Sequence, residues 1–462
     1  METADTGAGA APSDLLAIID SSALTPRYWA TFGLITFQLT AEIFDFVLVS
    51  FLVSALAPAW HLTFGQTTII LLASGFGSIF GAMGFGWIAD RMGRKFAVVT
   101  GVFVCCTAAG LIALIPDGAW VLFAMLRLVV GFGYGGAVAI QFNLVVEYTP
   151  TRLRTLMASA VGIPASLGVV GASLIVANLF QVIGWRGTAA LGATPILIAI
   201  AIAFVAPESV RWLISHGRIE EARKALAKML KKPLQEIPTP VISAAPAKPP
   251  AMIEAFADQR RLWLLICLHV GLGATLTGVV LWGPTMLSLI LKITAQQAAS
   301  YFIFISLCGF VGRIFFTYLP HKVGRLKTGY VVGTGGAIAL AGAALLHDQS
   351  LAGVSLFLVF MLAGHFFYDG GFSNLNTYGA EIYPVRLAGL GMGVSQAASG
   401  IGKILGPLVL GLLAGSDNLV TPAATEQAVV PGFLFLSVCC VLMVFAYATL
   451  GIETHRKALA LT

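Results

Sequence analysis

The chain has 462 residues, of which 58% are hydrophobic and only 10% are charged, and its formal net charge is +6. A soluble domain carries about 25% charged residues because its surface faces water, so this composition excludes a soluble enzyme and predicts a protein surrounded by lipid. The basic residues form short clusters between apolar runs rather than one long stripe, which argues against a nucleic-acid partner.

The chain opens on a polar segment, residues 1–26, that is rich in small residues and holds four acids. It has no basic region followed by a short apolar run, which is the pattern of a signal peptide. We therefore predict a cytoplasmic N-terminal segment, with membrane insertion starting at the first hydrophobic helix.

Twelve segments are long and apolar enough to cross a bilayer, which takes roughly 20 residues of helix. The predicted spans are 30–56, 67–89, 96–115, 119–146, 155–181, 187–206, 261–287, 298–319, 328–346, 351–378, 387–414 and 430–450. Glycines in the second, fourth, fifth and eleventh spans predict close approach of neighbouring helices.

Lysine and arginine collect on one side of these spans. With both termini inside, the outer loops keep only Arg186 and Lys292, and most other basic residues fall in inner segments. Cytoplasmic loops are enriched in basic residues. The alternation therefore favours twelve spans in the cell inner (plasma) membrane, with both termini cytoplasmic.

A polar segment at 207–260 divides the spans into two groups of six. Its first part has helical character with paired charges such as Glu220 and Lys224 at i,i+4, and residues 233–250 are proline-rich, which predicts a flexible linker. We expect five regions. They are an N-terminal segment at 1–26, a six-helix bundle at 27–206, a cytoplasmic linker with an amphipathic helix at 207–260, a second bundle at 261–450 and a cytoplasmic tail at 451–462.

Two motifs recur in the second group at nearly the same offset. The run at 86–95, after the second span, has a degraded copy at 321–325, and the run at 147–154, after the fourth span, returns at 381–387. Two motifs at one offset indicate an internal duplication. The predicted fold class is an all-α membrane protein with twelve transmembrane helices in two parallel six-helix repeats, an arrangement that places a substrate site between the repeats near the midplane.

The run G-x-x-x-D-R-x-G-R-K at 86–95 resembles the signature loop of the major facilitator superfamily, and the resemblance covers roughly residues 28–452. The glycine-rich run at 127–136 and Pro207-Glu208-Ser209 are similar to the branch that holds sugar porters, organic-ion transporters and bacterial aromatic-acid and nicotinate proton symporters. The first span, with Asp45 followed by Ser50-Phe51, looks closest to the last of these. The second signature loop departs from the first by having His321 in place of Asp90.

Charged groups inside a span are costly and mark function. Asp45 in the first span and Arg127 in the fourth lie at similar depths at 1.5 Å per residue, so we expect an ion pair. The resemblance implies that this pair couples transport to protons; the alternative is a fixed pair that only neutralises two buried charges. Glu42, one turn from Asp45, is a second candidate for the protonation site.

Lys403, in the eleventh span among glycines, is a candidate contact for a substrate carboxylate, or else pairs with Asp369 in the tenth span. Asp369 and His365 lie at i,i+4 and predict a polar stripe that faces a cavity. Arg313 either binds ligand or extends to the membrane interface. The predicted substrate-binding set is Lys403, Asp369, His365, Gln141, Asn143, Tyr368, Trp282 and Arg313.

The repeated loops predict a conformational gate at the inner ends of the helices. We expect charge contacts between Asp90 and Arg94, and between Glu147 and Arg154, that hold the outward-facing state. The full predicted gate set is Gly86, Asp90, Arg91, Gly93, Arg94, Glu147, Arg154, Glu381 and Arg386.

The sequence, with this resemblance, predicts a secondary active transporter, a proton-coupled symporter that imports a small organic anion such as an aromatic or nicotinate-like carboxylate by alternating access. The alternatives are a sugar or polyol proton symporter and a drug exporter, although the fifth span lacks the adjacent Gly-Pro of exporters. The partners expected are a small-molecule substrate, protons and the bilayer, with the chain a monomer. The cysteines have no metal-ligand spacing and no nucleotide loop is present, so neither a cofactor, nor a metal, nor an enzyme activity is expected.

Overall fold

The computed structural model describes residues 15–153, 157, 160–239, 258–375, 378–383 and 388–454. The long helices of the first half are α2 (Pro26–Ala59), α3 (Phe64–Met92), α4 (Arg94–Leu111), α5 (Trp120–Glu147), α7 (Ala165–Ala190) and α8 (Ile196–Val205). Those of the second half are α12 (Gln259–Ile290), α13 (Ala295–Val323), α14 (Arg325–Leu345), α15 (Leu356–Leu375), α17 (Ala388–Leu413) and α18 (Pro422–Leu450).

These helices account for twelve membrane crossings, of which the sixth combines the end of α7 after Gly184 with the ten residues of α8. Eleven stretches of the described chain are long and apolar enough to cross, and one of them, Ala160–Val205, has 46 residues, about twice the length that one crossing needs. Gly184 breaks this stretch with φ 63° and ψ −176°, inside the range assigned to α7. The chain therefore doubles back there, and the predicted twelve-helix fold is confirmed.

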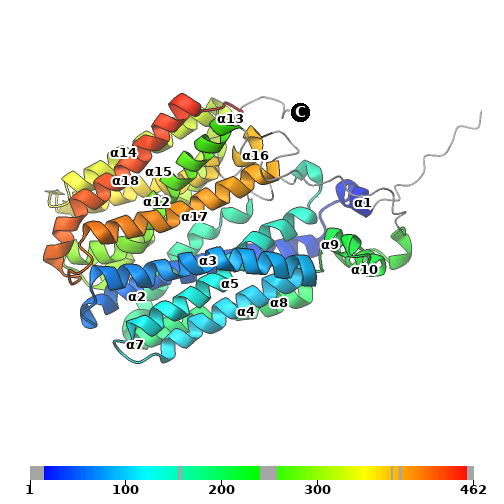
Figure 1. Cartoon of the computed structure of the whole chain (residues 1–462), viewed down its shortest axis with the longest axis horizontal. Helices are drawn as coiled ribbons and strands as arrows, with labels where there is room; N and C mark the ends of the chain where they lie inside the picture. The colour runs from blue at the N-terminus through cyan, green and yellow to red at the C-terminus, as the bar shows by residue number, and fades with distance from the viewer. Residues whose placement is uncertain are drawn as a thin grey trace, which may run out of the picture.

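Figure 1 shows the crossing helices as one elongated bundle, with the short helices α1 (Leu15–Ser21), α9 (Val210–Ser215) and α10 (Ile219–Leu230) gathered at one end. The described C-terminal residues lie at the same end, which we call the terminal face. The other end, which carries the turn before α3 and the strands β1 (Ser350–Leu351) and β2 (Val354–Ser355), is the opposite face.

The two halves repeat the same helix starts. α3 begins with a capping box in which Thr63 and Gln66 satisfy each other's backbone N–H, and α13 begins with the same device at Thr294 and Gln297. Both pairs open a helix that runs from the opposite face toward the terminal face. The repeat seen in the loop motifs therefore extends to the helix ends.

Glycines set the closest helix pairs, as the sequence predicts. An added Cβ at Gly131 would overlap the backbone of Ser74, so α5 and α3 touch main chain to main chain. The second half repeats this between α13 and α15, where Gly312 has no room beside the backbone of Phe366. Both contacts are possible only because these positions lack a side chain.

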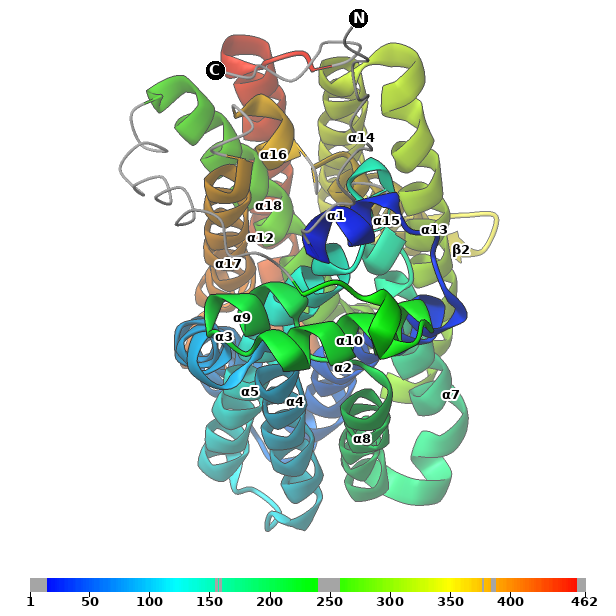
Figure 2. The same ribbon diagram turned by 90° about the vertical axis from the view of Figure 1, so that its right-hand side faces the viewer.

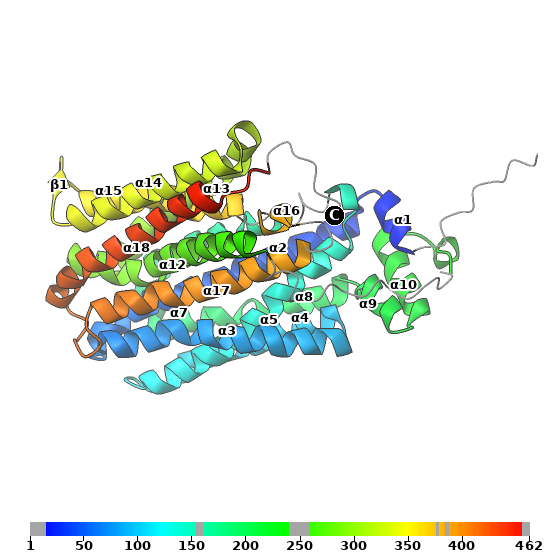
Figure 3. The ribbon, with the colours of Figure 1, turned by 45° about the horizontal axis from the view of Figure 1, so that its top comes forward.

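Several contacts join the halves at the opposite face. There the Ser54 and Ser288 hydroxyls lie 3.2 Å apart, and Gln296 donates to the Ala177 carbonyl at 2.6 Å. The amide of Phe64 also donates to the Asn418 carbonyl at 2.9 Å. Figure 3 shows α12 and α17 of the second half lying along α2 and α3 of the first. These contacts between the halves close this conformation at the opposite face.

Two predicted helix starts are wrong. The tenth span begins at Leu356 rather than 351, because residues 350–355 pair as a short hairpin of β1 and β2 instead. The twelfth span begins at Pro422 rather than 430, because Thr421 caps it and proline fits the first helical turn. In both cases local backbone hydrogen bonding set the boundary that hydropathy alone could not.

The segments outside the membrane are more structured than predicted. α1 lies within the segment expected to be merely polar, and Leu15 and Ile19 are buried against α9 and α10. Gly217, with φ 69°, separates α9 from α10. Figure 2 shows this small layer of helices across the terminal face of the first half.

The expected Glu220–Lys224 pair is wrong, because Glu220 pairs with Arg223 at 2.8 Å instead. The described residues also include the short helix α16 (Tyr378–Ile382) and the 3-10 turns η1 (Ile112–Leu114), η2 (Thr151–Leu153), η3 (Leu191–Ala193) and η4 (Leu234–Glu236). Most of the predicted linker, 240–257, lies outside the described residues.

Candidate functional site

The expected ion pair of the first half is present. Arg127 Nη1 lies 2.8 Å from Asp45 Oδ2, and the arginine side chain is only 2% exposed. Its Nη2 also lies 3.5 Å from the Ser74 hydroxyl. A cavity of about 10 Å³ beside the pair is lined mostly by apolar side chains such as Leu52, too small for more than about one water. The pair is therefore closely packed.

Glu42 is the acid without a cation. Its Oε1 accepts from Gln141 Nε2 at 2.7 Å and from Gln38 Nε2 at 3.5 Å, and within the described ranges no basic side chain bonds it. Among the residues that the structure describes, its Oε2 has no hydrogen-bond partner, and neither do the amide oxygens of Gln38 and Gln141. This cluster holds three buried acceptors that lack a donor, so one added proton would satisfy two of them.

The second half holds a different kind of ion pair. Arg313 Nη2 and Nε lie 2.7 and 3.1 Å from Asp369 Oδ1. The same two side chains also bond the first half, because Ser166 donates to Asp369 Oδ2 at 2.9 Å and Arg313 Nη1 donates to the Gly162 carbonyl at 3.0 Å. This pair is therefore also a link between the halves.

The fifth span offers these two partners because Pro164 interrupts it. Proline prevents a regular helix through this position, and α7 begins only at Ala165. Gly162 is the last helical residue before the turn at Ile163 and Pro164, and its carbonyl accepts from Arg313 at this break in the helix. A sequence feature of the first half thus creates the acceptor that the second half binds.

These contacts correct two predictions. Asp369 pairs with Arg313 and not with Lys403, because α13 packs directly against α15 and brings the guanidinium to the carboxylate. Arg313 does not extend to the membrane interface, since that ion pair holds it inside. Three of the five N–H donors of its guanidinium are used in bonds to Asp369 and Gly162.

Lys403 is half-buried in α17, and no hydrogen bond or ion pair joins its ammonium to any part of the chain that the structure describes. Its carbonyl accepts from the Thr277 hydroxyl at 3.3 Å, which fixes the backbone at this point. Gly402 and Gly406 beside it face α12 closely, whereas nothing lies within 4 Å of an added Cβ at Gly400. Lys403 is therefore a cation without a described partner, one helical turn from open space at Gly400.

Several predicted lining residues are packed instead. His365 is buried between α13 and α15, where an added Cβ at Gly309 would contact it, so the polar stripe does not face a cavity here. Tyr368 bonds His365 at 3.3 Å, and Trp282 donates to the Pro407 carbonyl at 3.0 Å. Gln141 bonds Glu42 rather than lining a cavity. The side chain of Asn143 lies outside the described residues.

A larger cavity of about 350 Å³ lies between the halves at the opposite face. Its polar lining consists of Ser54, Gln181, Ser288, Thr294 and Gln296, with no charged side chain. It is therefore a candidate vestibule, while the charged groups that could hold a proton or an anion lie deeper.

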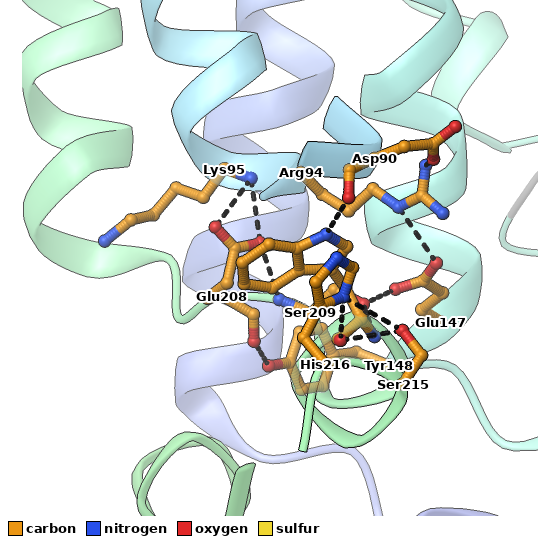
Figure 4. Close-up of polar contacts among 10 residues, drawn as sticks. Asp90, Arg94, Lys95, Glu147, Tyr148, Glu208, Ser209, Ser215 and His216 are labelled. Carbon is orange, nitrogen blue, oxygen red and sulfur yellow. Dashed lines mark hydrogen bonds and ion pairs between the residues drawn. The ribbon is translucent and has the colours of Figure 1, made fainter. Parts of the chain in front are cut away.

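The predicted gate is organised around Arg94 in the first half (Figure 4). Arg94 lies 3.2 Å from Asp90 and 3.8 Å from Glu147. Glu147 also accepts from the Ser209 hydroxyl, and Glu208 accepts from the Lys95 amide at 3.0 Å. These contacts stay within the first half and are formed here with the opposite face closed, so the expectation that they hold the outward-facing state is not confirmed.

Gly93 is required at this gate. Its φ is 109°, which side chains disfavour, and an added Cβ would overlap the Glu208 carboxylate. Gly86 has open space around it, and Arg91 stacks on Trp87 with 4.2 Å between the guanidinium carbon and the ring centroid.

The second half builds the same gate from different residues. Gly324 has φ 95°, and Glu453 accepts from the Arg325 amide at 3.0 Å, as Glu208 does at Lys95. Arg325 Nε lies 3.1 Å from Glu381, as Arg94 faces Glu147. His321 therefore does not remove the ionic contact of this half. Arg154 and Arg386 lie outside the described residues, so the expected Glu147–Arg154 contact stays a prediction.

Sequence reasoning missed Ser166, Glu208 as a helix cap, and Glu453. Glu208 and Glu453 each follow the last span of a half, and this repeated position was a signal in the sequence. Ser166 gave no signal, because serine in a span is ordinarily a packing residue.

Comparison with known proteins places these features in a family. A model of the Major Facilitator Superfamily matches residues 34–407. The niacin transporter NiaP of Acinetobacter baylyi is 25% identical over 457 residues, covering 96% of this chain and 99% of that protein. The 4-hydroxybenzoate transporter PcaK of Pseudomonas aeruginosa is 26% identical over 446 residues, covering 90% and 95%.

Solved structures agree on the fold. The inward-open xylose transporter XylE from E. coli superimposes with a TM-score of 0.70 at 17% identity, covering 94% of this chain and 98% of that one. An inward-facing bacterial homolog of the human lysosomal transporter Spinster gives a TM-score of 0.67 at 16% identity, covering 93% and 98%. The chain is a multi-pass membrane transporter and not an enzyme, and it belongs to the major facilitator superfamily.

Proposed function

We propose that the chain is a proton-coupled symporter that imports a small organic anion, such as an aromatic or nicotinate-like carboxylate, by alternating access. The observation that carries this proposal is an imbalance of buried charge. Away from the helix ends, the described spans of the first half hold Glu42 and the Asp45–Arg127 pair, which leaves one acid in excess. Those of the second half hold the Arg313–Asp369 pair and Lys403, which leaves one cation in excess.

Uncompensated charge is expensive inside a membrane protein. A proton on Glu42 neutralises the first half, and a carboxylate on Lys403 neutralises the second. The buried charges of the two halves sum to zero when both are loaded and when both are empty, and to one unit of charge when only one is loaded. This gives a physical reason for the halves to change conformation only when both are loaded or both are empty.

Glu42 is the proton carrier in this scheme. The protonated acid donates through Oε2 to an amide oxygen of Gln38 or Gln141, both of which lack a donor in the present structure. Asp45 is the less suitable carrier, because its carboxylate is already bonded to Arg127 at 2.8 Å. The role of the Asp45–Arg127 pair is to hold α2 against α5 at the depth of Glu42.

Lys403 holds the substrate carboxylate. Its ammonium has no partner among the described residues, and a lysine is a compact charge that can follow a small anion. Relatives named for niacin and 4-hydroxybenzoate transport support an aromatic acid, since both compounds carry a carboxylate beside a ring. The gate residues, whose described contacts stay within each half, fix the shape of the terminal-face loops in this scheme and do not bridge the halves.

The orientation follows from charge. The terminal face carries the basic loops, with Arg91 and Arg94 in one half and Lys322 and Arg325 in the other, and basic loops stay in the cytoplasm. Both termini are then cytoplasmic, and the contacts at the opposite face close the outer side. The present conformation corresponds to the inward-facing state of the inner-membrane carrier.

Uptake into proteoliposomes tests the proposal. Labelled nicotinate, 4-hydroxybenzoate, benzoate and glucose are offered with and without an inward proton gradient. We expect at least one of the aromatic acids to accumulate only with the gradient. Accumulation of an acid that ignores the gradient would refute symport, and accumulation of glucose alone would indicate the sugar-porter alternative.

Two variants separate the roles of the halves. Glu42→Gln is expected to lose gradient-driven accumulation while keeping exchange of substrate for substrate, because glutamine mimics the protonated acid. Lys403→Met is expected to lose both, because the anion has no cation to bind. Glu426→Gln, which removes an exposed acid at the start of α18, is the matched control and leaves both activities unchanged.

A further inference from the structure

Three basic side chains converge on the terminal-face end of α8. Arg27 donates to the Val205 carbonyl at 3.0 and 3.2 Å, and Lys95 donates to the Ala203 carbonyl at 3.0 Å. Lys228 lies 3.3 Å from the carbonyl of Phe204, between these two. The three side chains come from the starts of α2 and α4 and from α10, yet they bind three consecutive residues of α8 and therefore lie close together.

The three positive charges are not balanced. The C-terminal end of a helix supplies only about half a negative charge, and within the described ranges no carboxylate forms an ion pair with any of the three. Glu208 bonds the backbone amide of Lys95, and Figure 4 shows the Lys95 side chain extending away from it. Burial, and then the charges of Arg27 and Lys95, lower the pKa of Lys228. A cluster of this kind favours an added anion.

The surroundings of the cluster face lipid. Leu197, Ile200 and Phe204 of α8 are 68%, 45% and 75% exposed, and their i, i+3, i+7 spacing forms one apolar stripe that ends at the basic cluster. Trp29, two residues after Arg27, and Phe96, next to Lys95, are also exposed. Exposed aromatic side chains of this kind gather at the level of lipid headgroups.

We propose that Arg27, Lys95 and Lys228 bind the phosphate of an anionic phospholipid, whose acyl chain lies along Leu197, Ile200 and Phe204. The stripe selects a lipid over a free anion, since it leads from the hydrocarbon region to the cations. The bound phosphate bridges α2, α4 and α10 and so stabilises the first half and its small layer of helices. This site is independent of the transported substrate.

Thermal unfolding of the full-length protein in detergent tests the site. Added phosphatidylglycerol is expected to raise the unfolding midpoint, whereas phosphatidylcholine and inorganic phosphate are not. The variant with Arg27→Gln, Lys95→Gln and Lys228→Gln is expected to lose at least half of the phosphatidylglycerol effect. Lys322→Gln, an exposed lysine of α13 on the same face but in the other half, keeps the full effect.

Native mass spectrometry provides a second measurement in case the triple variant fails to fold. Lys228→Gln alone changes an exposed residue and is expected to weaken phosphatidylglycerol binding about fivefold, the usual contribution of one lysine at an anionic surface. Three results would each overturn the proposal. The first is an equal effect of phosphatidylcholine and phosphatidylglycerol, and the second is reproduction of the effect by inorganic phosphate. The third is lipid binding that is unchanged both in Lys228→Gln and in the triple variant. The basic side chains would then serve only to cap α8.

Discussion

The two halves share a fold but use their buried ion pairs differently. Asp45 and Arg127 bond only within the first half, and Ser74, the third residue of that cluster, also belongs to it. Arg313 and Asp369 bond each other and also the first half, through Gly162 and Ser166. A pair that is internal to one half moves with it as a rigid unit, whereas a pair that crosses must break some contacts when the halves tilt.

This difference assigns the two pairs separate physical effects. The first contributes to the stability of one bundle in every conformation. The second also stabilises the present conformation relative to one that opens at the opposite face. Thermal unfolding measures the effect on stability, and the labelling rate of a reporter cysteine measures the effect on conformation. A suitable reporter is Ser288→Cys, which lines the cavity at the opposite face and reacts with a membrane-impermeant maleimide when that face opens.

Loss of Arg127 is expected to have the largest effect. Arg127→Met leaves the Asp45 carboxylate buried without its cation, and breaking a buried pair in this way costs about 3–5 kcal/mol. The unfolding midpoint of the purified protein should fall sharply. The double variant Asp45→Asn with Arg127→Met removes both charges and should recover most of the loss. If the double variant is as unstable as the single one, the pair matters for packing and not for charge.

Loss of Asp369 is expected to have a smaller effect on stability but a second effect on conformation. Asp369→Asn weakens the bonds to Arg313 and Ser166, and hydrogen bonds to charged groups contribute about 1.5–3 kcal/mol. The unfolding midpoint should fall, and labelling of the Ser288→Cys reporter should become faster. Arg127→Met should not change that labelling in protein that remains folded. Equal labelling in both variants would contradict the proposed division between the halves.

The two terminal-face gates provide a third comparison, because here the halves are equivalent. Gly93→Ala and Gly324→Ala each place a Cβ against a carboxylate at a positive φ, which costs about 1–3 kcal/mol. Both variants should therefore lower the unfolding midpoint by similar amounts. Gly86→Ala is the control, since it has open space in the interior of α3, where alanine is the better helix former. If the unfolding midpoint falls equally in all three variants, the loss of stability does not come from the positive φ and the nearby carboxylate at Gly93 and Gly324.

The smallest expected effect isolates the link between the halves. Ser166→Ala removes one hydrogen bond to Asp369 and leaves the Arg313–Asp369 pair in place. The reporter cysteine should be labelled about 3–10 times faster, equivalent to roughly 1 kcal/mol, with little change in the unfolding midpoint. Ser173→Ala is the control, because the Ser173 hydroxyl bonds only the Val169 carbonyl of its own helix. If Ser173→Ala also makes labelling of the reporter cysteine faster, the effect of Ser166→Ala does not come from its hydrogen bond to Asp369.

The amino-acid sequence by itself determined the architecture. The hydropathy of a span depends only on about 20 consecutive residues, so the twelve crossings could be located from the sequence. The duplicated motifs then indicated the repeat. The Asp45–Arg127 pair was also predictable, because depth in a membrane follows from residue number along a helix. Glycine pairs in the second and fourth spans predicted the close helix contacts for the same local reason.

Only the tertiary structure decided which side chains meet. A helix that is surrounded by lipid on one side and by other helices on the other is apolar all round, so the sequence carries little information about its rotation. That rotation brought Arg313 rather than Lys403 to Asp369, and placed Ser166, 203 residues away in the chain, on the same carboxylate. It also surrounded Glu42 with amides and no cation, which no count of residues along the chain could predict.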